Sequence, residues 1–319
     1  MTEPSSRDPS VSQVVVTPVY EDIDASSRLF RELATVMGPE LYVVAIDDGS
    51  VRQPVSPAAI AAAGLRGSVV KLNRNVGHQS AIAVGLNFVA ERFPNAVCIV
   101  MDSDGEDLPA TVPVLLAPLA SADVDAVVAR RLKRVESLQF RTFYVLYRFV
   151  FQALSGRQIS FGNFMALKPA AVRRLAAMHE LWIHVASCLL VSKLRLSICP
   201  LDRGPRYAGQ SKMNFSGLVL HGFRALMVVA ENVLVRVGLA CAAISALSLF
   251  GIIVSILLKL AGFATPGWFS IALGILLIVL LQTGALTLMT LMLTGVVRSG
   301  NLMTIDYRTI VEEVLDVDG

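Results

Sequence analysis

Several features that mark common protein classes are missing from this chain of 319 residues. It has no run of five or more Lys or Arg residues and a formal net charge of only +3, which argues against a nucleic-acid-binding surface. It also has no internal repeat or low-complexity tract. Its four cysteines show neither a CxxC pair nor the spacing of metal ligands, so we interpret them as reduced structural thiols: Cys98, Cys188, Cys199 and Cys241.

The N-terminus lacks an apolar stretch. Its first ten residues, MTEPSSRDPS, are polar, whereas a cleavable secretory signal needs an apolar segment of about 7–15 residues. We therefore expect residues 1–12 to form a disordered tail and the soluble part of the chain to stay in the cytoplasm.

Hydrophobic residues, in contrast, make up 54% of the chain, and their excess lies after Leu234. Residues 234–260 and 268–297 each exceed the roughly 20 apolar residues that a membrane-spanning helix needs. The connecting sequence AGFATPG is uncharged, whereas arginines flank the outer ends of the pair: Arg224, Arg236, Arg298 and Arg308. We predict a two-helix transmembrane hairpin over residues 234–297 with both flanks in the cytoplasm. Two buried helices of a soluble protein are the alternative.

Two further segments are amphipathic. Residues 216–233 place His221, Arg224 and Glu231 among apolar neighbours directly before the hydrophobic segments, which predicts a helix at the membrane interface. Residues 137–154 are rich in aromatic residues and arginine, and they suit either a core or a membrane surface. We expect residues 298–319 to form a cytoplasmic C-terminal tail.

Short apolar runs alternate with helical patterns between residues 13 and 215. The expected strands are 14–19, 41–48, 68–72, 96–102 and 125–130, and the expected helices include 25–37 and 77–93. This alternation predicts an α/β fold with a mostly parallel sheet and flanking helices. In such sheets, ligands bind beyond the carboxyl ends of the strands.

The strongest motif for chemistry is MDSDGED, which starts at Met101. Asp102 and Asp104 flank Ser103 directly after a predicted buried strand. Alternate carboxylates on a short turn can hold a hard divalent cation, and such a cation neutralises a diphosphate leaving group. For an isolated DxD, a solvated acidic turn is the alternative.

Two more predicted strands end in acidic residues. VVVTPVYED brings Pro18, Tyr20 and Asp22 to the end of the first strand. AIDDGS brings Asp47 and Asp48 to the end of the second. An aromatic ring can stack on a base, and a carboxylate can accept from base N–H or ribose hydroxyl groups. Because clustered carboxylates repel one another unless a cation or donor compensates them, we interpret the acidic strand ends as one nucleotide and metal site.

With these motifs the chain resembles the family-two glycosyltransferases of GT-A fold. Within them it is similar to the branch that glycosylates polyprenyl phosphates and includes dolichyl-phosphate mannose synthases. The matching motifs, in family order between Val14 and Lys212, are PVYED, IDDGS, NRNVGHQSAIAVG, MDSDGED, RRLKRVES, FGNFMAL and RYAGQSK. Two terminal membrane helices complete the architecture of that branch.

The resemblance implies roles for particular residues. Those implied for the nucleotide sugar are Pro18, Tyr20, Asp22, Asp47, Asp48, Gly77, Asp102 and Ser103. Those implied for binding Mg2+ or Mn2+ are Asp104 and Glu106, with Asp102 beside them. Those implied for catalysis are Asp102, Asp104, Arg131, Arg206 and Lys212.

Some positions depart from the family pattern. Glu106 stands where the family usually has Gln, which adds a negative charge and would change the preferred metal or its affinity. Glu21 replaces the usual Asn, and Met165 stands where the family often has Arg. The Met165 position therefore lacks one cationic clamp.

Two groups of basic residues are candidates for phosphate binding. One group follows the fifth predicted strand, and the other precedes the predicted interfacial helix. Arg131 and Arg134 are in the first group, and Arg206 and Lys212 in the second. Their side chains would clamp the donor diphosphate or the acceptor phosphate. Contact with anionic lipid headgroups is the alternative. Two histidines, at 184 and 221, have apolar sequence neighbours and no partner at metal spacing, so we interpret them as structural.

We therefore predict metal-dependent transfer of a sugar from a nucleotide diphosphate sugar to a polyprenyl phosphate at the cytoplasmic membrane face. The resemblance implies that the transfer inverts the anomeric configuration and favours uridine over guanosine in the donor. A GDP-mannose-using enzyme like the dolichyl-phosphate mannose synthases and an inactive membrane scaffold of the same fold are the alternatives. A processive polysaccharide synthase is disfavoured, because the Q-x-x-R-W motif is absent and two terminal spans are few for a translocation channel. The membrane helices would also allow assembly into a homo-oligomer.

Overall fold

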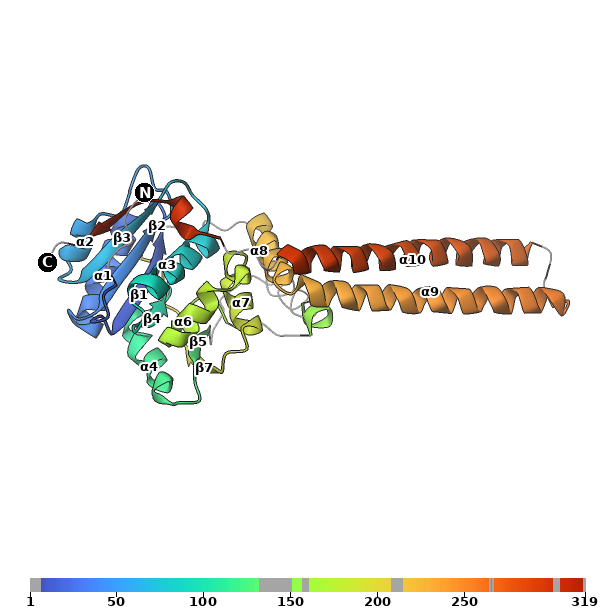
Figure 1. The fold of residues 1–319 in the computed structure, drawn as a ribbon, viewed down its shortest axis with the longest axis horizontal. Coiled ribbons are helices and arrows are strands. Elements are labelled where there is room, and N and C mark those ends of the chain that lie inside the picture. Colours follow the sequence, from blue (N-terminus) through green and yellow to red (C-terminus); the bar gives the residue numbers. More distant parts are fainter. Residues whose placement is uncertain are drawn as a thin grey trace. The chain divides into compact units, whose positions relative to one another are not determined.

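The computed structural model describes residues 7–131, 151–156, 161–207, 215–263, 265, 267–300 and 305–317. The chain divides into two compact units. One comprises residues 1–144, 159–228 and 303–319, and the other comprises residues 145–158 and 229–302. The first contains a sheet with helices on both faces, and the second contains two long helices (Figure 1).

Within the described residues, an eight-stranded sheet organises the first unit, in the order β7-β5-β6-β4-β1-β2-β3-β8. Its strands are β1 (Gln13–Val19), β2 (Tyr42–Asp47), β3 (Arg66–Leu72), β4 (Val97–Val100), β5 (Ala126–Arg131), β6 (Met165–Leu167), β7 (Leu196–Leu201) and β8 (Val311–Asp316). β1 pairs in parallel with β2 and β4, as β2 does with β3 and β5 with β7. β6 and β8 run antiparallel to their neighbours. The mostly parallel α/β fold that the sequence predicts is confirmed.

Helices cover both faces of this sheet. They are α1 (Ile23–Met37), α2 (Pro57–Ala61), α3 (His78–Arg92), α4 (Val112–Leu116), α6 (Pro169–Ala176) and α7 (Val185–Val191). A further helix, α8 (Phe215–Met227), follows β7 in the chain. Short 3-10 helices are η1 (Pro109–Thr111), η2 (Ala117–Ala120), η3 (His179–Trp182) and η4 (Tyr307–Ile310). Successive strand residues point to opposite faces, so Val14 and Val16 pack with α3, α6 and α7, and Val15 packs with α1, α2 and α4. The central strands β1 and β2 are therefore buried on both faces and consist mostly of apolar residues.

The C-terminal segment does not form the tail expected for residues 298–319. Val311–Asp316 is strand β8, which pairs antiparallel with β3 and covers that edge of the sheet. Arg92 donates from its two terminal nitrogens to the Asp316 carboxylate over 2.7 and 2.8 Å. Tyr307 donates to Glu91 over 2.6 Å. The acidic strand VEEVLD thus finds its partners on basic residues more than two hundred positions earlier, which no local pattern in the sequence indicates.

The second unit contains α9 (Ala230–Leu260) and α10 (Trp268–Gly300), both long and apolar enough to cross a membrane. They pack through small and polar residues: the Ser245 and Thr283 hydroxyls are 2.6 Å apart, and a Cβ on Gly238 would lie 2.8 Å from Thr290 Oγ1. Large apolar side chains such as Leu247 are exposed on the remaining surface. Exposed apolar side chains around tightly packed small residues are typical of helices in lipid.

Two predicted helices have different limits in the structure. The stretch 216–233 is divided, because α8 ends at Met227 and α9 already begins at Ala230, with Glu231 in its first turn. An acidic residue favours a helix start at that place, since it complements the positive end of the helix dipole. Of the predicted helix 137–154, residues 151–154 are described and helical, and the rest lies outside the described residues.

Candidate active site

The sheet brings the acidic strand ends to one edge. β4, β1 and β2 are adjacent and parallel, with Val16 paired to Val100 and Val19 paired to Asp47. Their carboxyl ends therefore lie side by side, where open α/β sheets bind ligands. The residues that follow these strands use their carboxylates in different ways.

The carboxylates after β2 bind backbone N–H groups of nearby loops. Asp47 is fully buried and accepts from the N–H groups of Ser50 and Val55 over 2.8 and 2.9 Å. Asp48, 3% exposed, accepts from the N–H groups of Val76 and Gly77 over 2.7 and 3.0 Å. Burial raises the pKa of Asp48 above its ordinary value, although these two bonds favour its ionised form. Both side chains thus build the loops around the site.

The residues after β1 have similar structural partners. The Asp22 carboxylate caps α1 by accepting from Ala25 N–H over 3.2 Å. Glu21 accepts from three successive backbone N–H groups at residues 51–53, over 2.8 to 3.0 Å. These bonds, that of Val51 first, hold the pKa of Glu21 below its ordinary value. Pro18 lies inside β1, whereas the Tyr20 ring is 42% exposed and can stack on a base.

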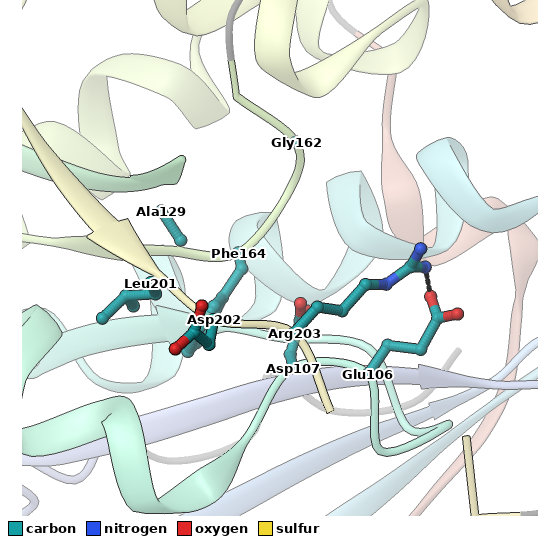
Figure 2. Close-up of a pocket in the computed structure, with 8 residues that line it drawn as sticks. All are labelled: Glu106, Asp107, Ala129, Gly162, Phe164, Leu201, Asp202 and Arg203. Carbon is teal, nitrogen blue, oxygen red and sulfur yellow. Dashed lines mark ion pairs between the residues drawn. The ribbon is translucent and has the colours of Figure 1, made fainter. Parts of the chain in front are cut away.

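The carboxylates after β4 contact charged side chains instead. Asp102 Oδ1 lies 3.1 Å from His78 Nε2, and Asp104 Oδ2 lies 3.0 Å from an Arg206 terminal nitrogen. Glu106 accepts from Arg206 Nε over 3.0 Å and also forms an ion pair with Arg203 (Figure 2). Basic side chains therefore compensate part of the negative charge of this acidic turn, which we define as residues 102–107.

The backbone of the acidic turn is held from within. Asp104 Oδ1 accepts from Glu106 N–H and Asp107 Oδ2 accepts from Asp102 N–H, each over 3.0 Å. Gly105, between them, has a φ of +85°, a conformation that favours glycine. Ser103 is buried in the turn. The MDSDGED motif therefore forms a compact loop whose backbone is fixed by its own acidic side chains.

Residues 203–207, which follow β7, run along the acidic turn. Gly204 N–H donates to the Glu106 carbonyl over 2.9 Å, and Tyr207 N–H donates to the Asp104 carbonyl over 2.8 Å. A small pocket lies beside this contact (Figure 2). Its lining residues are Glu106, Asp107, Ala129, Gly162, Phe164, Leu201, Asp202 and Arg203. The start of the RYAGQSK motif is therefore physically joined to MDSDGED.

The acidic turn fits a divalent cation in its chemistry. Asp102, Asp104 and Glu106 offer carboxylate oxygens, the ligands that Mg2+ and Mn2+ prefer. Within the described ranges, no three His, Cys, Asp or Glu side chains are gathered closely enough to hold one ion. The reason is visible in the contacts, because guanidinium groups occupy two of the carboxylates. Binding of a cation there would require exchange of these ion pairs.

His78 is a site residue that the sequence reasoning missed. It begins α3 directly after Gly77, whose φ is +89°, and its ring contacts both Asp102 and the amide of Asn163 at 3.1 Å. Burial opposes protonation, but the neighbouring Asp102 carboxylate raises the pKa of His78 above its ordinary value. Its place inside NRNVGHQSA, a motif already matched to the family, was the available signal.

The two histidines interpreted as structural contact each other. His184 Nε2 lies 3.1 Å from His221 Nε2, and His184 Nδ1 accepts from Ser187 N–H over 3.1 Å. Because Nδ1 of His184 is an acceptor, its Nε2 carries the proton and His221 Nε2 accepts it. This bond joins the N-cap residue of α7 to α8.

The basic residues predicted for the site have three different outcomes. Arg206 lies on the acidic turn, as described above. Arg131 is the last residue of β5. Arg134 and Lys212 lie outside the described residues.

The chain belongs to glycosyl transferase family 2, whose model matches residues 14–182. The family resemblance read from the motifs is thus confirmed. The chain is similar to the undecaprenyl-phosphate 4-deoxy-4-formamido-L-arabinose transferase of Edwardsiella ictaluri, with 27% identity over 212 residues. This match covers 64% of our chain and spans only 64% of that relative's length.

Solved structures of a Mycobacterium tuberculosis glucosyl-3-phosphoglycerate synthase share the fold. The complex with Mg2+ and uridine diphosphate has a TM-score of 0.51 at 14% identity, covering 70% of our chain and 79% of that chain. A complex with Mn2+, UDP-glucose and phosphoglyceric acid has a TM-score of 0.52 at 14% identity, with coverages of 70% and 80%. At this identity the likeness concerns the fold alone.

Proposed function

We propose that this protein is a membrane-attached, metal-dependent glycosyltransferase that moves a sugar from a nucleotide diphosphate sugar to a polyprenyl phosphate with inversion. The observation that carries the proposal is the contact between the acidic turn and the basic residues 203–207 at the carboxyl edge of the sheet. The curated relative, whose name states transfer to undecaprenyl phosphate, supports the acceptor class. The uridine-bound structures of the same fold favour a UDP-sugar as donor.

Asp104 and Glu106 would hold Mg2+ or Mn2+, and Asp102 would contact the donor. When bound there, the cation supplies neutralising charge for the diphosphate. Pro18 and Tyr20 would contact the nucleoside. The hydrogen bonds to backbone N–H groups suggest that four other residues support the nucleoside site from outside and do not contact the nucleoside: Asp22, Asp47, Asp48 and Gly77. Ser103 lies in the turn between the two aspartates.

In the proposed reaction, an acceptor phosphate oxygen attacks the anomeric carbon as the bond from that carbon to the nucleotide diphosphate breaks. A phosphate monoester has a second pKa of about 6, so it is largely ionised at neutral pH and needs no strong general base. Asp102 would then orient the sugar. Arg206, released from the acidic turn, and Arg131 and Lys212 would bind the phosphates of donor and acceptor.

The path of the chain supports a hairpin topology. β8 follows α10 yet lies in the same sheet as the strands that precede α9. If α9 and α10 both cross the membrane, the sheet can form only when their outer ends lie on the same side. The arginines at these ends favour the cytoplasmic side. The apolar, exposed Leu220 and Phe223 of α8 suit the membrane interface there.

The test is transfer from a panel of radiolabelled UDP- and GDP-sugars to short polyprenyl phosphates by the purified protein, with Mg2+, Mn2+ or chelator. Cation-dependent formation of one lipid-linked sugar from a UDP donor supports the proposal. Transfer only from GDP-mannose would assign the chain to the mannose synthase type. Nucleotide binding without any transfer would favour an inactive scaffold of the same fold.

A further inference from the structure

The ring of Tyr207 lies over the acidic turn. A Cβ placed on Gly105 would meet ring carbons of Tyr207 at 2.7 Å. The Tyr207 ring therefore covers Gly105, the one residue of the turn without a side chain. The Tyr207 N–H also donates to the Asp104 carbonyl over 2.8 Å. Ring and backbone of one residue therefore both contact the part of the turn between Asp104 and Glu106.

The other end of the ring is anchored on α1. The Tyr207 hydroxyl donates to Glu32 Oε2 over 2.6 Å, the short distance of a bond to a charged acceptor. Glu32 Oε1 accepts from Arg28 Nε over 2.9 Å, and the Arg28 guanidinium lies over the Tyr207 ring at 4.2 Å from its centroid. Three side chains, those of Arg28, Glu32 and Tyr207, thus connect α1 to the acidic turn.

We propose that Tyr207 is a positioning residue, and that its hydroxyl bond to Glu32 holds the backbone of the acidic turn in place, so that the turn can bind a divalent cation once its ion pairs with Arg203 and Arg206 have exchanged. The inference rests on the proposed function for the identity of the cation-binding residues. Mutation of a residue that orients a metal ligand without binding the metal itself usually lowers metal affinity or activity by about 10–100-fold. Neither Glu32 nor Arg28 touches a substrate in this assignment, so both act through Tyr207.

The experiment measures Mn2+ affinity by calorimetry, in the full-length protein without nucleotide. Tyr207→Phe keeps the ring over Gly105 and removes only the hydroxyl, and Glu32→Leu removes its acceptor. We expect each to weaken Mn2+ binding about tenfold, and the double variant to be no weaker than either single one. Glu32→Gln retains an acceptor oxygen and should bind Mn2+ nearly as the unaltered protein does.

The matched control is Glu40→Leu, the same change at a carboxylate whose side chain is 89% exposed. Thermal unfolding of every variant separates a local effect from loss of fold. The proposal is overturned if Glu32→Leu binds Mn2+ normally, if the two single effects multiply in the double variant, or if the unaltered protein binds no Mn2+. A parallel transfer assay on the unaltered protein tests the proposed function separately, because Mn2+ binding requires no acceptor lipid.

Discussion

The carboxylates at the end of β2 and those after β4 belong to the two strands that flank β1, yet they have different kinds of partner. Asp47 and Asp48 accept from backbone N–H groups of the loops that surround them. Asp104 and Glu106 contact guanidinium groups of residues about a hundred positions away, and the second oxygen of Asp104 also accepts from a backbone N–H group, that of Glu106. A backbone donor cannot leave without unfolding its loop, whereas an arginine side chain can rotate away. The first pair is therefore suited to support, and the second to exchange its partners for a ligand.

The largest expected effect comes from removing an exchangeable carboxylate. Asp104→Ala should lower kcat for sugar transfer about a thousandfold, because the loss of several kcal/mol of charge stabilisation at the diphosphate costs a factor of ten per 1.4 kcal/mol. Its unfolding temperature should fall less than that of Asp47→Ala, because Asp104 accepts from one backbone N–H group and the buried Asp47 from two. Transfer kinetics and thermal unfolding are measured together, with Asp123→Ala, at an exposed acidic side chain, as the control. Unimpaired turnover of Asp104→Ala with cation present would refute this role.

A supporting carboxylate should show the opposite pattern. Asp47→Ala leaves the N–H groups of Ser50 and Val55 without their acceptor inside the protein, which should lower the free energy of unfolding by about 3 kcal/mol. Denaturant unfolding, followed by the signal of the sheet domain, measures this change. Asp47→Asn keeps one acceptor oxygen and should lose about half as much. Equal stability of Asp47→Ala and the unaltered chain would remove the distinction between the two groups.

Much of the fold was predictable, because parallel strands buried on both faces leave continuous apolar runs such as VVVTPV. The extra strands were not. β6 has only three residues. β8 becomes a strand through its pairing with β3, which lies about 240 positions earlier in the sequence. Such contacts depend on the tertiary structure and leave no periodic signal in the local sequence.

The site was predictable in its location but not in its internal division. The motifs place Asp48 and Asp104 alike, as acidic residues just beyond a buried strand. The partner of each carboxylate, a backbone N–H group or a basic side chain, depends on the conformation of the loop that follows the strand. Motif spacing does not indicate that conformation. The roles of Arg203, Tyr207 and Glu32 also depend on contacts between distant segments, so the structure is needed to find them.

The histidine pair differs from both groups of carboxylates, because a hydrogen bond joins two neutral side chains, those of His184 and His221. Burial lowers the pKa of His184 to about 3, and burial with nearby charge on His78 and Arg224 also lowers that of His221. Both pKa values are thus below the value of about 6.5 in the unfolded chain. The folded chain binds fewer protons below pH 6.5, so stability is full above that pH and falls as the pH drops towards 3.

Acidification from pH 7.5 to 5.5 should therefore weaken the packing of α8 on α7 by about 1.4 kcal/mol, the cost of one pH unit for one such group. Hydrogen exchange of the α8 amides at the two pH values measures the effect. His184→Gln should flatten this pH dependence, and the same change at His179 serves as the control. A pH-independent α8, or equal slopes in the two variants, would show that the pair does not stay neutral.

The smallest expected effect tests whether the cation replaces an arginine partner of Glu106. If Arg203 must leave Glu106 before a cation binds, Arg203→Gln removes a competitor and should tighten Mn2+ binding without nucleotide. A partly exposed ion pair contributes up to about 1 kcal/mol, which corresponds to roughly a fivefold change in affinity. Arg195→Gln, which breaks a pair with Asp125 outside this turn, is the control and should leave the affinity unchanged. Tighter Mn2+ binding together with a higher KM for the donor would indicate that Arg203 moves from Glu106 to the diphosphate, whereas unchanged or weaker Mn2+ binding would mean that it supports the turn, as the backbone donors support Asp47.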